Sequence, residues 1–296
     1  MELILGALAL GFAYAFLGMG IFITMRIFNF PDITADGSLT LGAAITAALL
    51  SAGVDPYLTA LAAMAGGFMA GALTGTLYTR FRINGLLSGI LVMTALYSVN
   101  LRVMGRSNVP LINLPSVLTP LRDLGPEGYG QIVPIALFLA LAAIAVALLS
   151  WLFRTDFGLA MRATGDNETM IAAQGVDTDA MKIIGIGIAN ALIALSGSLV
   201  AQYQGFADIG MGIGIIVFGL ASVIIGDTLA GLFGDRFRIA LKLACVIVGS
   251  ILFRGLVAAT LSLGLSPTDL KLVTAFFVFL TILLPQARGM LRLRAR

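Results

Sequence analysis

Charged side chains inside long apolar stretches are the residues of this sequence that most clearly need a functional or structural explanation. Arg254 is the first of them. A lone arginine near the centre of a membrane-spanning helix costs about 2.5–3.5 kcal/mol on insertion scales, so Arg254 needs a partner or water. Asp227, in the preceding apolar stretch, is the candidate acid. A structural ion pair or hydrogen-bonded arginine is the leading interpretation; pathway lining and a helix-end position are the alternatives.

Polar residues gather towards the outer ends of two further apolar stretches. One group is Tyr97, Ser98 and Asn100, and the other is Gln202, Tyr203, Gln204 and Asp208. Carboxamides suit neutral polar solutes, whereas tyrosine also anchors helices at membrane interfaces, so solute contact and anchoring both stay open. The candidate pathway residues are Ser38, Tyr97, Asn100, Gln202, Gln204, Asp227 and Arg254.

Enzymatic chemistry finds little support. The chain has no histidine and a single cysteine, Cys245, which excludes imidazole ligands, Ser-His nucleophiles, histidine proton relays and an intramolecular disulfide. It has no G-x-x-x-x-G-K-[ST] phosphate loop, and no basic run interleaved with aromatics that would bind nucleic acid. We therefore expect no catalytic residue, no metal site and no nucleic-acid partner.

Composition indicates that helices in a membrane position these residues. Of 296 residues, 59% are apolar and 11% are charged, and the mean hydropathy is +1.03. An average soluble domain has about 25% charged residues. This composition is typical of a polytopic membrane protein and excludes a disordered chain, a secreted disulfide scaffold and a cytosolic enzyme.

Eight apolar stretches are long enough to cross roughly 30 Å of hydrocarbon as helices. They are residues 3–25, 57–79, 85–105, 131–153, 183–203, 214–234, 239–263 and 269–286. A ninth, residues 38–52, is short and follows an irregular polar segment, so it could expose backbone groups to a pathway, as broken helices do in other transporters. The predicted fold is an all-α polytopic membrane protein with about 8–9 transmembrane helices, one short or broken near the N-terminus, forming a single domain over residues 1–296.

Basic residues predict the orientation. With nine crossings, twelve Lys and Arg residues fall in loops on the side of the C-terminus and two, Arg106 and Arg122, on the other side. Positively charged loops stay in the cytoplasm, so we expect the N-terminus outside and the C-terminus inside. Within the membrane, Gly67, Gly71 and Gly75 predict close helix packing inside the chain rather than a dimer contact.

Two loops are more than connections. The external loop, residues 106–130, contains four prolines, which forbid one continuous helix and indicate a compact cap or a packed loop. The internal loop, residues 154–182, has helix signals: Asp166 or Asn167 can cap a short helix running to Gln174, and Gly175 follows its end. Small side chains around this helix would let a partner approach closely.

At this loop the sequence resembles the permease subunits of ABC importers of the branched-chain amino acid and ribose type. The matching positions are Gly158, Ala160, Arg162, Ala163, Asn167, Ala172 or Ala173, Gly175 and Val176. Further similarity lies in the glycine-rich residues 189–204, in residues 219–226, and in the small-polar stretch 36–43. The acidic Asp32 and Asp36, and Asp227 after the paired glycine, depart from the family pattern.

This resemblance implies the partners. A second permease, identical or different, would complete the pathway in the bacterial inner membrane. An external binding protein would deliver a small polar solute such as an amino acid. Separate ATPase subunits, which carry ATP and Mg²⁺, would bind the internal loop. The implied ATPase-coupling residues are Arg162, Ala163, Thr164, Gly165, Asn167, Glu168, Ala172, Gln174 and Gly175. Membrane lipids are the remaining partner. A stand-alone secondary transporter or channel is the alternative, and a membrane-embedded enzyme is the poorest fit.

Overall fold

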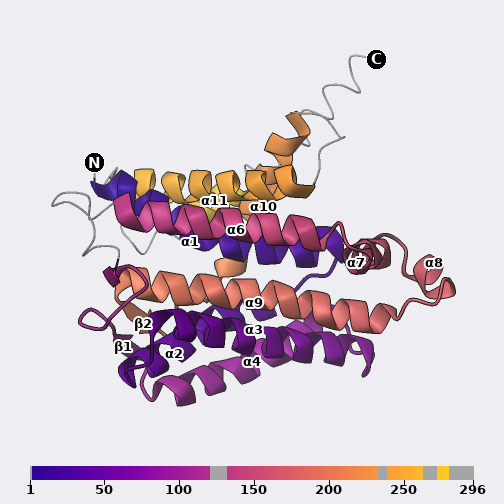
Figure 1. Cartoon of the computed structure of the whole chain (residues 1–296), viewed down its shortest axis with the longest axis horizontal. Coiled ribbons are helices and arrows are strands. Elements are labelled where there is room, and N and C mark those ends of the chain that lie inside the picture. Colours follow the sequence, from indigo (N-terminus) through magenta and orange to yellow (C-terminus); the bar gives the residue numbers. More distant parts are fainter. Residues whose placement is uncertain (1, 121–131, 233–238, 263–271, 280–296) are drawn as a thin grey trace.

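The computed structural model describes residues 2–120, 132–232, 239–262 and 272–279, and within them the chain is a bundle of helices that run along one common axis (Figure 1). The longer helices are α1 (Glu2–Phe22), α2 (Thr34–Ser51), α3 (Pro56–Thr79), α4 (Gly85–Met104), α6 (Ile132–Leu152), α9 (Thr178–Gln204), α10 (Ile215–Leu232) and α11 (Ile239–Ser262). The shorter elements are the π-helix η1 (Ile23–Ile27), α7 (Asp156–Asp166), α8 (Glu168–Ala173) and the strands β1 (Asn108–Pro110) and β2 (Phe206–Asp208). The predicted all-α polytopic fold is confirmed.

Six helices of the described part are long and apolar enough to cross a membrane. They are α1 continued through η1, α3, α4, α6, α9 and α11. Each coincides with a predicted stretch. α10 is shorter, with an apolar part at Ile215–Gly231, and the last predicted stretch, 269–286, is described only over its helical residues 272–279.

The predicted ninth stretch, residues 38–52, lies within α2, a continuous helix that begins earlier than predicted and is not among the six candidate spans. Residues 34–37, expected to be irregular, form its first turn, because the Asp32 side chain accepts the Thr34 N–H at 2.9 Å and so starts the helix. The break lies before α2, at residues 28–33, where Asn29 has a φ of 51° and Pro31 removes a backbone donor. The segment that joins η1 to α2 is therefore not helical.

Helix α9 is the centre of the bundle. Figure 1 shows it between α1, α6 and α11 on one side and α2, α3 and α4 on the other. Its contacts depend on glycine: a Cβ at Gly71 of α3 would overlap the carbonyl oxygen of Ile186, and one at Gly42 of α2 would overlap that of Ala194. Gly197 of α9 meets the Leu39 carbonyl in the same way. The prediction that Gly67, Gly71 and Gly75 pack inside the chain is confirmed.

Changing Gly71 to alanine is expected to lower stability by about 1–3 kcal/mol, because the new methyl group displaces the backbone of α9. The measurement is the thermal midpoint of the detergent-solubilised protein. Gly255→Ala on α11 is the matched control, since a Cβ there meets nothing within 4 Å. Equal midpoints for the two variants would contradict the close contact.

Candidate functional site

The internal loop folds as two short helices at one end of the bundle (Figure 1). Asn167 caps α8 by accepting the Met170 N–H at 3.0 Å, so of the two predicted caps Asn167 is the one used. The helix ends at Ala173, and Gly175 follows with a φ of 88°, as a residue past a helix end requires. The preceding helix α7, which the sequence reasoning missed, begins where the Thr155 hydroxyl accepts the Gly158 N–H.

The predicted coupling residues divide into two sets. The exposed ones are Arg162, Asn167, Glu168, Ala172, Gln174 and Gly175. Thr164 is buried, and Ala163 is half-buried. Gly165 lies against the end of η1, where a Cβ would overlap the Ile27 carbonyl oxygen. The expectation that Gly165 gives a partner room to approach is therefore wrong: its missing side chain makes room for the chain's own backbone.

Side-chain contacts tie α8 to the transmembrane helices. Glu168 forms an ion pair with Lys182 of α9 at 2.6 Å, and the Lys182 ammonium lies 5.0 Å from the centre of the Tyr78 ring on α3. Lys182 is nearly buried, whereas Glu168 is about half exposed. These contacts link α8 to α9 and to α3, the two helices in closest contact.

The prediction that Asp227 is the partner of Arg254 is wrong. Asp227 pairs with Arg26 of η1 instead, a residue 201 positions away in sequence. Arg254 lies over the ring of Tyr14, with its guanidinium carbon 5.8 Å from the ring centre, in a cation–π arrangement. The two predicted residues thus belong to different parts of the bundle.

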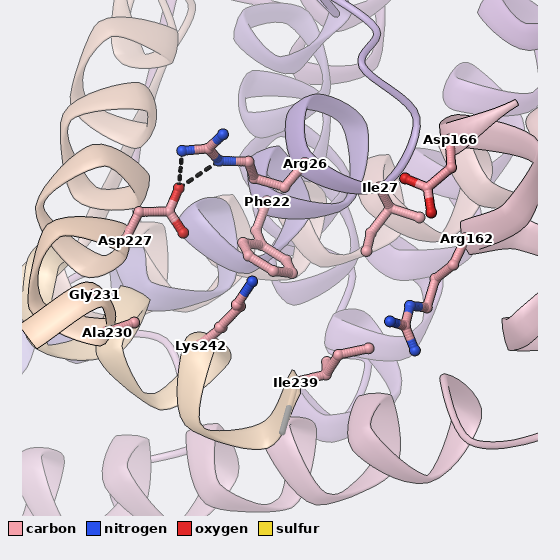
Figure 2. Close-up of a pocket in the computed structure, with 10 residues that line it drawn as sticks. All are labelled: Phe22, Arg26, Ile27, Arg162, Asp166, Asp227, Ala230, Gly231, Ile239 and Lys242. Carbon is pink, nitrogen blue, oxygen red and sulfur yellow. Dashed lines mark hydrogen bonds and ion pairs between the residues drawn. The ribbon is translucent and has the colours of Figure 1, made fainter. Parts of the chain in front are cut away.

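A polar cavity surrounds the Arg26–Asp227 pair at the same end of the bundle as α7 (Figure 2). Its volume is 410 Å³. The lining residues are Phe22, Arg26, Ile27, Arg162, Asp166, Asp227, Ala230, Gly231, Ile239 and Lys242. The cavity is thus lined by both an exposed coupling candidate, Arg162, and a pathway candidate, Asp227.

A buried polar network links α2 to α9 around Asn190. Its amide nitrogen donates to Asp32 at 2.7 Å, and its oxygen accepts from the Ser38 hydroxyl at 2.7 Å. Asp32 and Ser38 are 2% and 0% exposed. Ser38, a pathway candidate, is therefore committed to a structural hydrogen bond in this conformation. Sequence reasoning missed Asn190, which sits among apolar and small residues of one helix.

Asp36 holds the start of α10. Its two carboxylate oxygens accept the Gly214 N–H at 2.7 Å and the Ile216 N–H at 2.9 Å. These are amides at a helix N-terminus, which favours negative charge. On the other side of the same turn, Asn100 donates to the Gly37 carbonyl at 3.2 Å, and its own oxygen is buried without a partner in the described residues.

The described part of the external loop packs against the opposite end. β1 pairs antiparallel with β2, and the Gln202 side chain accepts the Val117 N–H at 2.9 Å. Gln202 therefore fastens the loop to α9, while Tyr97 is exposed and Gln204 half-buried. The remaining predicted loop residues, 121–130, lie outside the described residues.

These features define a multi-pass helical membrane protein with a non-helical segment before α2 and an exposed pair of short helices at one end. A family model described as "Branched-chain amino acid transport system / permease component" matches residues 3–283. The chain therefore belongs to this family of ABC importer permeases, as the sequence resemblance indicated.

Named relatives agree with the family. The chain is 43% identical over 262 residues to a tyrosine transport system permease protein of Clostridioides difficile, covering 88% of this chain and 84% of the relative. It is 26% identical over 255 residues to the ribose import permease protein RbsC of Escherichia coli, covering 85% and 76%. The solved structure of PsaBC from Streptococcus pneumoniae in complex with Fab matches with a TM-score of 0.51 and 14% identity, over 95% of this chain and 89% of that one, and supports the fold alone.

Proposed function

We propose that this chain is the membrane permease of an ATP-driven importer whose separate ATPase binds the exposed face of α7 and α8. The observation that carries the proposal is the connection of that face to the bundle: α8 is exposed, yet Glu168 ties it to Lys182 of α9. The contact face comprises Arg162, Asn167, Glu168, Ala172, Gln174 and Gly175. Thr164 and Gly165 support it from behind.

The other partners follow from the family. A second permease completes the pathway, and an external binding protein docks at the end that carries β1 and β2. This places α7 and α8 in the cytoplasm and the N-terminus outside, in agreement with the twelve-to-two distribution of basic loop residues in the sequence. The membrane is the bacterial inner membrane, and ATP and Mg²⁺ belong to the ATPase.

The solute is a small polar molecule of the amino-acid type. The 43% identity to a permease named for tyrosine transport supports this class. The pathway candidates that stay available for solute are Tyr97, which is exposed, Asn100, which has an unpartnered buried oxygen, and Gln204. Ser38, Gln202, Asp227 and Arg254 contribute by positioning the helices and loops around the pathway.

Changing Ala172 to arginine tests the contact face. A long charged side chain on α8 is expected to reduce solute-stimulated ATP hydrolysis by the reconstituted transporter at least about tenfold, the factor that corresponds to 1.4 kcal/mol of lost coupling. The matched control is Ala172→Ser, which keeps a small side chain at the same exposed position. Unchanged stimulation in Ala172→Arg would contradict the proposed contact.

A co-purification experiment tests the class itself. An affinity-tagged chain, extracted from its own cell in mild detergent, is expected to bring down a stoichiometric ATPase subunit that mass spectrometry identifies. Recovery of the chain alone, even after crosslinking through a cysteine placed at Ala172, would favour a stand-alone secondary transporter instead.

A further inference from the structure

We propose that the cavity beside the Arg26–Asp227 pair binds the phosphate of an anionic phospholipid headgroup. Three cationic side chains from three different elements line it: Arg26 of η1, Arg162 of α7 and Lys242 of α11. Among the described lining residues two are acidic, Asp166 and Asp227, and Asp227 already pairs with Arg26. The cavity therefore carries an excess of positive charge.

The cations that stay available are Arg162 and Lys242. Neither forms an ion pair within the described part of the chain, and both are exposed. Figure 2 shows the Lys242 ammonium on the side of the Arg26–Asp227 pair and the Arg162 guanidinium across the cavity. Arginine and lysine donors that converge from two sides are the groups that bind phosphate oxygens in proteins.

The walls of the cavity suit a group attached to lipid. Phe22, Ile27 and Ile239 give it apolar sides next to the charged atoms. Gly231 leaves one side open, since a Cβ at this position would meet nothing within 4 Å. A headgroup needs both properties, because its phosphate is charged and its glycerol backbone continues into hydrocarbon.

The depth of the cavity favours a lipid over a free anion. Arg26 lies one residue before the end of the apolar span Leu3–Ile27, and Phe22, which also lines the cavity, lies five residues before that end. At about 1.5 Å per residue the cavity reaches roughly 8 Å into the span, which is the thickness of one headgroup layer of a bilayer. Basic pockets between transmembrane helices at this depth bind anionic headgroups.

Native mass spectrometry of the full chain in detergent tests the site. Delipidated protein is titrated with phosphatidylglycerol and with phosphatidylcholine of the same acyl chains. We expect phosphatidylglycerol to bind more tightly than phosphatidylcholine. The double variant Arg162→Ala with Lys242→Ala is expected to weaken phosphatidylglycerol binding by about fivefold for each charge removed. Gly231→Leu, which fills the cavity without a backbone clash, is expected to weaken it as well.

Arg80→Ala is the matched control, because Arg80 is an exposed cation at the end of α3 outside the cavity. Glycerol 1-phosphate and inorganic phosphate, each added as competitors, separate the two sources of a phosphate group. The lipid assignment holds if they displace phosphatidylglycerol only in large excess, and it is overturned if they bind as tightly as the lipid. Equal binding of phosphatidylglycerol by all four proteins would overturn the site altogether. This experiment does not depend on transport, so its outcome is independent of the proposed import function.

Discussion

Asn190→Leu is expected to abolish most of the folded protein. The substitution leaves the carboxylate of Asp32 and the hydroxyl of Ser38 buried without the amide that each of them contacts at 2.7 Å. Leaving a buried hydrogen-bonding group without its partner costs about 1–3 kcal/mol, and this substitution does so at two groups. A typical protein has only about 5–15 kcal/mol of total stability. The measurement is the monodisperse yield from size-exclusion chromatography, together with the thermal midpoint of whatever remains.

A second substitution separates the buried charge from the loss of the amide. In the double variant Asn190→Leu with Asp32→Leu, the unsatisfied carboxylate is gone, so part of the lost yield is expected to return. Asn100→Leu is the matched amide control, because Asn100 is equally buried but donates one hydrogen bond and already has an unpartnered oxygen. If Asn190→Leu were no worse than Asn100→Leu, the Asp32 contact would not matter for folding.

The second large effect is expected for Asp36→Ala, which removes both acceptors at the start of α10. Hydrogen bonds to a charged group contribute about 1.5–3 kcal/mol each, and the Gly214 and Ile216 amides stay half-buried without a partner, so we expect a loss of about 3 kcal/mol. The measurement is thermal unfolding, combined with limited proteolysis that reports release of the segment before α10.

Asp177→Ala provides the comparison for a single cap. Asp177 accepts one amide, that of Ala180, at the exposed start of α9, and loss of such a cap typically costs about 1 kcal/mol. Asp36→Asn, which keeps an oxygen acceptor in place, is expected to fall between the two. Equal losses for Asp36→Ala and Asp177→Ala would show that the contact between α2 and α10 adds nothing to an ordinary helix cap.

Local signals in the sequence predicted the local features of this protein. The cap of α8, at one of the two residues proposed for it, and the glycine just past its end were predicted, because each depends on residues within a few positions of the helix end. The missed helix α7 had comparable signals in Thr155 and Asp156, but its eleven residues are too few and too polar to appear among long apolar stretches.

Contacts between distant segments could not be predicted in this way. Asp227 pairs with Arg26, not with Arg254, and Asp36 contacts a helix start 178 residues away, because the register between helices is set by packing over their whole lengths. A small side chain in the sequence also does not show which neighbour it faces. In the sequence, Gly165 looks the same whether it faces a partner protein or, as here, the carbonyl of Ile27.

The glycine contacts of α9 limit how this protein can move. A helix whose carbonyl oxygens occupy the space of its neighbour's missing Cβ atoms cannot slide along that neighbour, because the next residue in register would collide with it. Helices α2, α3 and α9 therefore have to travel as one rigid body. The non-helical residues 28–33 join η1 to this body, and residues 209–214 are held against it because Asp36 accepts the Gly214 N–H.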